Sequence, residues 1–199
     1  MCSQPSPLHA AADPELSAEE RRLLLEVAHR AIEAAFRGKP VDTTAPTPHL
    51  AARRGAFTTL HLDGRLRGCV GYILPACSLY RTVAETAVAA AFNDARFLPV
   101  TEAEAARLKV EISVLSPLRP ITPDEIQIGQ HGLVITLGLQ RGLLLPQVPV
   151  EYGWDRITFL EQTCTKAGLP PHAWKQGAVV EAFTAEIFGE AEIFGEAAC

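Results

Sequence analysis

The chain has 199 residues, of which 48% are hydrophobic and 21% charged, and its formal net charge is -5 at pH 7. These fractions exclude a chain that is disordered throughout, and the acidic balance gives no general case for binding to nucleic acid or to an anionic membrane. The five cysteines include no CxxC pair and no Cys/His pair at metal spacing, so we expect neither a disulfide framework nor a metal site. The chain opens on no charged-then-apolar leader and holds no apolar run of the ~20 residues that a membrane helix needs. We therefore expect a cytoplasmic protein with no membrane partner.

The N-terminal part of the chain is predicted to be a flexible tail followed by one long helix. Residues 1–16 are rich in Pro, Ser and Ala, a composition that favours fraying. Ser17 and Glu20 then form a capping box, in which each side chain satisfies a free backbone amide at the start of a helix. Apolar residues at helical spacing continue to about residue 37, and the prolines and threonines of residues 41–50 indicate a linker.

A hairpin is predicted where Asp-Gly at residues 63–64 separates two alternating runs, residues 55–62 and 65–71. Asp-Gly tolerates the positive φ angles that a two-residue type I′ turn requires. With these two residues as the turn, regular pairing places Thr58 opposite Cys69.

Two glycines flank that cysteine, Gly68 and Gly71, and glycine weakens a strand unless a backbone or ligand approaches closely or a bulge re-aims the chain. Alternation places Arg67 on the same face as Cys69 and His61 on the opposite face. One interpretation is a partly exposed thiol whose thiolate is favoured by the nearby cation, and the other is a small buried apolar side chain. The residues alone leave both interpretations open.

Four arginines fall between residues 52 and 68 against a single acid, and they are Arg53, Arg54, Arg65 and Arg67. They predict either a small anion-binding patch or a solvated basic edge of the sheet. The patch would be the place where RNA or a nucleotide binds, and such binding falls steeply as the salt concentration rises.

A second helix is predicted to begin after Ser78, its cap, and to run to about residue 93. Asp94 and Arg96 follow the helix between two aromatic residues. A structural ion pair is the favoured interpretation of these two residues, and a pair that lines a cleft is the alternative. A second capping box then opens a short helix at residues 101–107.

The next regular elements are predicted to be strands. Residues 109–115 alternate cleanly, with Glu111 facing away from the apolar positions. Two apolar runs bounded by glycines, residues 132–137 and 142–145, predict a further pair of strands.

Residues 146–155 are predicted to be irregular chain that holds Gln147 and Glu151 close together. This stretch is interpreted either as a loop that lines a pocket or as a plug over an apolar seam. Asp155 then caps a helix that ends at about residue 167.

The C-terminal part is predicted to be one strand and a tail. Residues 179–188 form the final strand of this prediction. The sequence Ala-Glu-Ile-Phe-Gly-Glu at residues 185–190 is repeated without change at residues 191–196, and one duplication is too few for a repeat architecture. We therefore expect one domain over residues 17–188 and a frayed tail over residues 189–199.

Four blocks of the sequence resemble the signature blocks of the AMMECR-one family. They are Leu-Arg-Gly-Cys-Val-Gly at residues 66–71 and the blocks at residues 91–97, 110–117 and 145–148. The match covers about residues 23–188, with Ala95 in place of the proline that is usual between the aspartate and the arginine. The resemblance implies an α+β fold with an antiparallel β-sheet core flanked by helices, and two unequal lobes with a cleft between them.

The sequence is similar to the bacterial type, protein A of the AmmeMemoRadiSam system, and this resemblance implies partners. Such proteins are commonly encoded beside, or fused with, a Memo-like protein and a radical S-adenosylmethionine enzyme. The reaction of the family is not established, and a role in nucleic-acid base modification has only been proposed.

Three functions from different classes stay open. The first is an enzyme in which Cys69 is the nucleophile or acid/base and Glu111 or Glu151 transfers protons. The second is an adaptor or binding module for the Memo-like and radical partners, and the third is a protein that binds RNA or a nucleotide. We expect no cofactor. The residues assigned to ligand binding in the inter-lobe cleft are Arg67, Gly68, Gly71, Asp94, Arg96 and Gln147.

Overall fold

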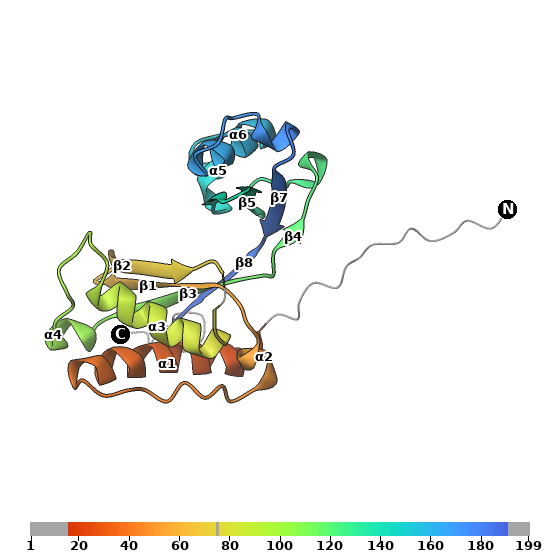
Figure 1. Cartoon of the computed structure of the whole chain (residues 1–199). Helices are drawn as coiled ribbons and strands as arrows, with labels where there is room; N and C mark the ends of the chain where they lie inside the picture. The colour runs from red at the N-terminus through yellow and green to blue at the C-terminus, as the bar shows by residue number, and fades with distance from the viewer. Residues whose placement is uncertain (1–15, 75, 191–199) are drawn as a thin grey trace.

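The computed structural model describes residues 16–74 and 76–190, which form two lobes around two antiparallel sheets (Figure 1). The first sheet has the strand order β2-β1-β3-β8, and the second has the order β4-β7-β5-β6. The predicted α+β class with antiparallel sheets is therefore confirmed. The strands are β1 Ala56–Leu62, β2 Arg65–Tyr72, β3 Lys109–Leu115, β4 Arg119–Pro120, β5 Gly132–Leu137, β6 Gln140–Leu144, β7 Val179–Phe183 and β8 Ala185–Gly189.

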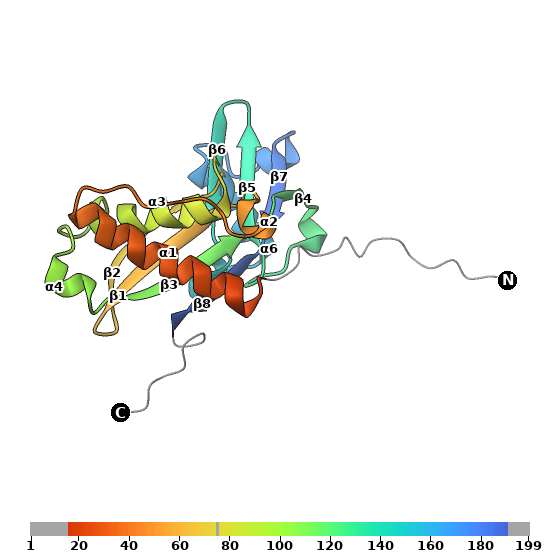
Figure 2. The same ribbon diagram turned by 90° about the horizontal axis from the view of Figure 1, so that it is seen from below.

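Two helices cover one face of the first sheet (Figure 2). α1 (Ala18–Phe36) and α3 (Leu79–Phe92) pack on each other and against the strands, and their apolar side chains form a large buried cluster. The predicted capping box starts α1 and the predicted serine caps α3, so both helices are confirmed. The remaining helices are α2 Pro48–Ala51, which lies in the expected linker, α4 Glu102–Ala105, α5 Gln147–Glu151 and α6 Arg156–Lys166, with 3-10 turns at η1 Pro123–Glu125 and η2 Ala173–Lys175.

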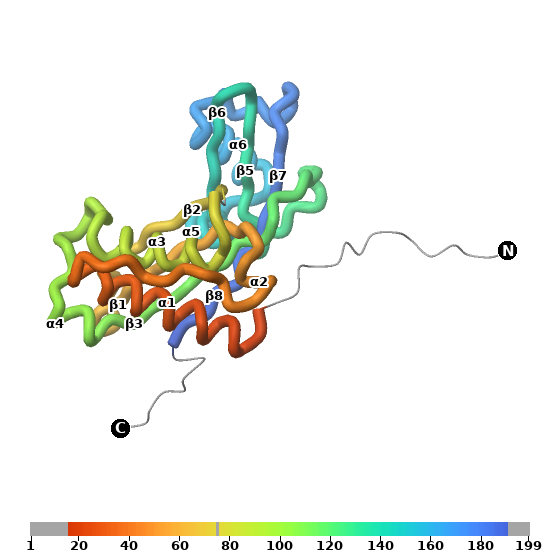
Figure 3. Tube along the Cα trace, turned by 60° about the horizontal axis from the view of Figure 1, so that its bottom comes forward, coloured from red at the N-terminus to blue at the C-terminus, as the bar shows by residue number. Residues whose placement is uncertain are grey.

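The second lobe stands beside the first (Figure 3) and has its own core under α6. Asp155 caps α6 as predicted, since its side chain accepts a hydrogen bond from the backbone N–H of Thr158 at 2.7 Å. Phe159, Leu160 and Cys164 on the inner side of α6 are completely buried. The predicted helix and its cap are therefore confirmed.

The hairpin of β1 and β2 carries a bulge that regular alternation does not predict. The pairing starts as expected beside the Asp-Gly turn, but β2 then holds one extra residue, Arg67. Thr59 therefore lies opposite Cys69, where the sequence predicts Thr58. Because a one-residue shift moves side chains to the other face of a sheet, Cys69 shares a face with His61, and the prediction of opposite faces is wrong.

The face of the first sheet that is turned away from α1 and α3 is here named the Cys69 face. Thr58 and Leu60 point towards the helices, because the Thr58 hydroxyl lies 2.8 Å from that of Thr86 and Leu60 is completely buried. The alternate residues of β1 and their partners therefore form the other face. The residues of the Cys69 face in β1, β2 and β3 include Phe57, Thr59, His61, Cys69, Gly71, Glu111 and Ser113.

The predicted single strand over residues 179–188 is two strands in different sheets. β7 ends at Phe183 in the second sheet, and β8 begins at Ala185 in the first. Where the chain leaves β3, the Ser116 N–H donates to the carbonyl oxygen of Thr184 at 2.9 Å, and the Thr184 N–H donates to the Ser116 hydroxyl at 3.0 Å. The single-strand prediction is wrong because an extended pattern does not reveal where a strand changes its pairing partner.

The ordered chain extends slightly beyond both predicted ends of the domain. Leu16 is buried, β8 includes Gly189, and Glu190 makes polar contacts described below. The rest of the two predicted tails, residues 1–15 and 191–199, lies outside the described residues. In the described part of the chain, no helix combines the length and the apolar character that crossing a membrane requires.

An apolar cluster joins the two lobes. Leu115 at the end of β3, Val134 of β5 and Phe183 of β7 are buried together, and Phe57 and Leu145 pack against them. The two hollows described in this structure, of about 440 and about 350 Å³, are both lined by residues of the first lobe. The cleft between the lobes therefore stays a prediction.

We expect Gly68→Ala to lower the free energy of unfolding by about 1–3 kcal/mol, because the new Cβ would overlap the backbone carbonyl of Ala90 in α3. The matched control is Gly189→Ala, whose Cβ would meet no atom nearer than 3.5 Å. Urea unfolding followed by circular dichroism measures both variants. Equal stability of the two variants would contradict the close approach of α3 to β2.

Candidate functional site

Arg67 fastens a neighbouring loop to the bulge in β2. Its guanidinium donates to the Glu104 carboxylate at 3.0 and 3.2 Å and to the carbonyl oxygens of Leu98 and Pro99 at 2.9 and 3.3 Å. The hydrogen bonds from Arg67 lower the pKa of Glu104 to about 2. Regular alternation predicts that Arg67 lies on the face of Cys69, but Arg67 is the extra residue of the bulge and its guanidinium bonds to the loop.

Asp94 and Arg96 form the ion pair that the sequence favours. Arg96 donates from Nη2 to Asp94 Oδ2 at 2.7 Å and from Nε to Asp94 Oδ1 at 3.0 Å. The Asp94 carboxyl is buried, whereas the outer part of Arg96 reaches solvent. Hydrogen bonds from Arg96, and then from the backbone N–H of Cys69, hold the pKa of Asp94 well below its usual range.

This ion pair provides hydrogen-bond partners for the backbone N–H and carbonyl of Cys69 at the outer edge of β2. β2 is an edge strand, so outward-pointing backbone groups have no neighbouring strand to bond. The N–H of Cys69 donates to Asp94 Oδ2 at 2.9 Å, and Arg96 Nη2 donates to the carbonyl oxygen of Cys69 at 3.3 Å. The two side chains thus replace the missing strand, and a role for them in ligand binding stays a prediction.

The two glycines of the hexapeptide are required by close packing. A Cβ at Gly68 would overlap the Ala90 carbonyl, and a Cβ at Gly71 would overlap the ring of Phe57. The sequence predicts that these glycines leave room for a ligand, a backbone or a bulge. The structure fills the space at both with protein atoms, so neither glycine provides an open ligand-binding surface here.

The thiol of Cys69 is the part of the hexapeptide that faces outward. Cys69 is half-buried, and its sulfur accepts a hydrogen bond from the Thr59 hydroxyl at 3.3 Å. Thr59 lies opposite Cys69 on one side and opposite Glu111 on the other, so the three form one row across the sheet. Thr59 is not among the residues predicted for the site, because regular pairing places Thr58 opposite Cys69. The bulge shifts the register by one residue and brings Thr59 to that position.

Gln147 and Glu151 belong to the second lobe. The predicted irregular chain is wrong at these residues, because they begin and end the short helix α5. Both side chains are exposed. Among the described residues, no hydrogen bond or ion pair joins either of them to Cys69, so the structure does not bring all the predicted site residues together.

The four arginines of the hairpin region do not form one patch. Arg53 and Arg65 are exposed at opposite ends of the hairpin, and Arg67 is occupied by Glu104. Arg54 is buried, with 7% of its surface exposed, and its Nε donates to the Leu115 carbonyl at 3.1 Å. Within the described part of the chain, its Nη1 is buried without a hydrogen-bond partner and no carboxylate pairs with it.

The described residues contain no cluster of three or more His, Cys, Asp or Glu side chains that could hold a metal ion. The arrangement at Cys69 instead offers a thiol, a hydroxyl and a carboxylate in one row. These groups can bind a polar ligand by hydrogen bonds, and the thiol can also act as a nucleophile.

Three comparisons show which known proteins this chain is similar to. The family model described as AMMECR1 matches residues 25–188. A protein of Methanopyrus kandleri is 40% identical over 190 residues, which cover 89% of this chain and 92% of that protein. A protein of Aquifex aeolicus is 41% identical over 185 residues, which cover 88% and 95% of the two chains. The crystal structure of an uncharacterized protein from Pyrococcus horikoshii has a TM-score of 0.70 and 41% sequence identity, over 83% of this chain and 89% of that one.

We expect Asp94→Asn to lower the free energy of unfolding by about 1–3 kcal/mol at pH 7, because Arg96 and the Cys69 N–H lose a charged acceptor. The folded-state pKa of Asp94 is lowered, so its contribution is complete above the ordinary carboxyl pKa and disappears as the pH falls through the folded value. The difference from the parent protein should therefore shrink below about pH 4. Urea unfolding between pH 3 and pH 7 measures it.

The matched control for this prediction is Asp63→Asn. Asp63 pairs with Arg107, but both side chains are largely exposed, so we expect little change in stability at any pH. Equal losses in the two variants would mean that Asp94 does not support the edge of β2.

Proposed function

Because the chain belongs to the AMMECR1 family, we propose that it works in a pathway with a Memo-like protein and a radical S-adenosylmethionine enzyme. Its task there is to bind a small or nucleotide-like substrate at the Cys69 face. The observation that carries this proposal is the setting of Cys69. Its backbone N–H and carbonyl are hydrogen-bonded by Asp94 and Arg96, while its thiol is half-buried and lies on the face turned away from the helices.

The surroundings of Cys69 fix its position before any ligand arrives. Asp94 holds its N–H, Arg96 holds its carbonyl, and the Thr59 hydroxyl contacts its sulfur. A group that is already ordered loses little conformational freedom on binding, so more of the interaction energy appears as affinity. The hexapeptide and the ion pair together support a preorganised binding surface.

Glu111 is the candidate proton-transfer group that lies nearest to Cys69 in the sheet. It occupies the same face in β3, with Thr59 of β1 between them. Glu151, the other candidate, belongs to α5 in the second lobe. Among the described residues, the Cys69 sulfur accepts a hydrogen bond from Thr59 and none from a histidine or a carboxyl group. The geometry therefore supports binding at this face more directly than nucleophilic catalysis.

A second candidate function is the binding of an anionic group at Arg54. Removing a guanidinium from water is costly unless hydrogen bonds and a counter-charge replace the lost hydration. Arg54 has one carbonyl acceptor and, among the described residues, no carboxylate. The missing counter-charge favours the binding of an external phosphate or carboxylate at Arg54. The predicted patch of four arginines is thereby reduced to one arginine that can be tested.

We expect iodoacetamide to label Cys69 at least tenfold faster than Cys164 in the folded protein, because Cys69 is partly accessible and Cys164 is completely buried. Burial also raises the pKa of the Cys164 thiol, which slows its reaction further. Addition of the Memo-like and radical proteins from the same genome should slow the labelling of Cys69. Peptide mass spectrometry separates the cysteines and gives each rate.

Two outcomes would contradict the proposal. A Cys69 that labels as slowly as Cys164 would be a packed strand residue without a binding role. If Cys69 labels quickly, but at the same rate with and without both partners, these partners do not bind at the Cys69 face. Cys77, which is also half-buried, serves as the internal reference for a thiol outside this face.

For the second candidate, we expect inorganic phosphate to raise the melting temperature of the parent protein by a few degrees, because a ligand that binds only the folded state stabilises it. Arg54→Gln should remove this rise. Arg53→Gln is the matched control, since it deletes an exposed arginine at the neighbouring position and should keep the rise. An equal response of the two variants to phosphate would refute an anion site at Arg54.

A further inference from the structure

One row of side chains across the Cys69 face has a positive end and a negative end. Thr59 lies opposite Cys69 on one side and opposite Glu111 on the other, so the three residues cross β2, β1 and β3 in one line. Arg96 lies beyond Cys69, because it donates a hydrogen bond to the Cys69 carbonyl at the outer edge of β2. The order of chemical groups along the row is therefore guanidinium, thiol, hydroxyl and carboxylate.

Arg96 is held in place but keeps hydrogen-bond donors for a ligand. Its Nε and Nη2 donate to Asp94 at 3.0 and 2.7 Å, and the carbon of its guanidinium lies 5.5 Å from the centre of the Phe97 ring. Nη1 makes no hydrogen bond within the described part of the chain, and 57% of the side chain is exposed. Hydrogen bonds to Asp94 raise the pKa of Arg96, and so does the charge of an ionised Cys69 thiol nearby. The guanidinium is thus fixed beside the thiol, with Nη1 available to a ligand.

The carboxylate of Asp94 does not cancel this positive end for a ligand at the surface. The Asp94 side chain is 6% exposed, so it lies on the protein side of the guanidinium. Its two oxygens accept hydrogen bonds from Arg96 and from the backbone N–H of Cys69. Because the attraction between charges falls with distance, a ligand that contacts Arg96 interacts more strongly with the guanidinium than with the carboxylate behind it.

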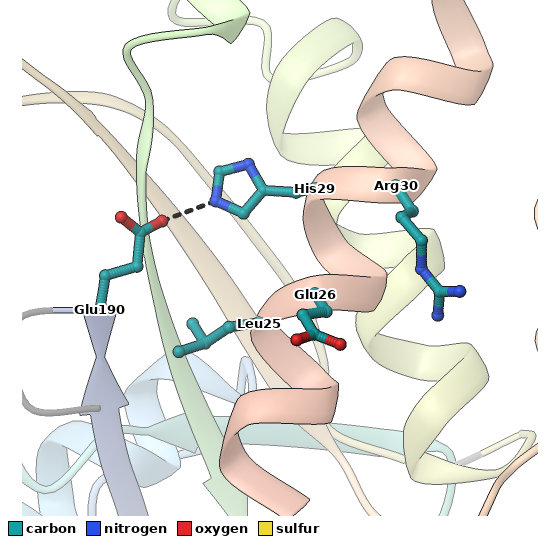
Figure 4. A pocket seen from close by; sticks show the side chains of 5 residues that line it. All are labelled: Leu25, Glu26, His29, Arg30 and Glu190. Carbon is teal, nitrogen blue, oxygen red and sulfur yellow. Dashed lines mark hydrogen bonds and ion pairs between the residues drawn. The ribbon is translucent and has the colours of Figure 1, made fainter. Parts of the chain in front are cut away.

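Glu111 provides the negative end of the row. It is half-buried, and among the described residues its carboxylate forms no hydrogen bond or ion pair. Lys109 lies two residues away on the same face, but it pairs at 3.1 Å with Glu190, which also lies 2.6 Å from His29 Nε2 (Figure 4). A partly buried carboxylate without a counter-charge favours a ligand that supplies one.

We propose that the ligand of the Cys69 face is a small molecule charged at both ends, with an anionic group that binds Arg96 and an amino group that binds Glu111. This inference rests on the proposed function, because it names the class of the small ligand that binds at this face. Cys69 and Glu111 are two strand spacings apart, so the two ends of the ligand are separated by about 10 Å or more. The middle of the ligand then lies over the thiol and the Thr59 hydroxyl.

The first test measures the charge preference of Cys69 with two methanethiosulfonate reagents, one with a sulfonate end and one with a trimethylammonium end. We expect Arg96→Gln to lower the ratio of the sulfonate rate to the trimethylammonium rate by about threefold or more, because the anionic reagent loses a nearby cation. Glu111→Gln should raise the same ratio, because the cationic reagent loses a nearby anion. A change in the exposure or nucleophilicity of the thiol acts on both reagents alike, so the ratio removes it. Peptide mass spectrometry gives each rate.

Two exposed charges outside the row provide the matched controls, Arg65→Gln and Glu33→Gln. Arg65 is four residues from Cys69 along β2, about 13 Å, which exceeds the ~8 Å over which salt screens charges at physiological ionic strength. Glu33 belongs to α1 on the opposite face of the sheet. Both controls should leave the ratio unchanged.

A ratio that stays the same in Arg96→Gln or in Glu111→Gln, or that moves in the same direction in both, would overturn the proposal. Labelling of Cys164, which is completely buried, identifies any variant that has unfolded. If Arg96→Gln unfolds, Glu111→Gln and the second test decide.

The second test uses the parent protein and three probes of nearly the same size. Extended triglycine carries a carboxylate and an ammonium group about 10 Å apart, whereas N-acetyltriglycine keeps only the carboxylate and triglycinamide keeps only the ammonium group. We expect triglycine to slow the labelling of Cys69 by iodoacetamide at least about twofold more than either of the other probes at the same concentration, because it alone pairs with both ends of the row. Equal effects of the three probes would overturn the proposal.

The outcomes also separate this inference from the proposed function. A Cys69 that labels quickly and is protected by the two partner proteins, but shows no charge preference and no preference for triglycine, would overturn the inference and leave the proposed function in place. A Cys69 that labels as slowly as Cys164 would contradict both.

Discussion

The outer edge of β2 is the constraint on which the candidate site depends. An edge strand has backbone groups that no other strand satisfies, and here they occur beside the bulge, where pairing with β1 is also irregular. Asp94 and Arg96 bond the N–H and the carbonyl of Cys69, and Arg67 ties the same strand to Glu104. The segment from residue 93 to residue 104 therefore takes the role of a neighbouring strand through its side chains.

This arrangement explains why most of the hexapeptide has a structural task. Gly68 lets the backbone of α3 approach closely, and Gly71 leaves space for the ring of Phe57. Arg67 donates hydrogen bonds to the loop at Leu98 and to Glu104. The extra residue of the bulge turns the thiol of Cys69 away from the helices and onto the open side of the sheet. Hydrogen bonds from its neighbours fix both the backbone and the thiol of Cys69, so the thiol is held in one orientation.

Local order could be predicted from the sequence, but long-range pairing could not. The capping box at Ser17 and the Asp-Gly turn mark their elements because the interactions involved span only a few residues. The bulge at Arg67 has no comparable signature, and without it alternation assigns Cys69 to the wrong face. The change of sheet at Thr184 depends on Ser116, which is 68 residues away along the chain.

The candidate site could be predicted in part, for the same reason. Asp94 and Arg96 are two residues apart, so their pairing is a local property that the sequence indicates. Thr59 becomes important only through the register of β1 with its neighbours, and Arg54 is distinguished from Arg53 only by burial. Proximity that depends on tertiary packing is not visible in residue spacing.

Phe57 connects the Cys69 face to the second lobe. It lies on this face beside Thr59, its ring covers Gly71, and it also packs into the apolar cluster with Leu145 that joins the lobes. A change in the packing of the second lobe must therefore move Phe57 or open a gap beside it, since apolar cores are closely packed. The ring of Phe57 is thus one direct contact between the apolar cluster that joins the lobes and the strand that carries Cys69.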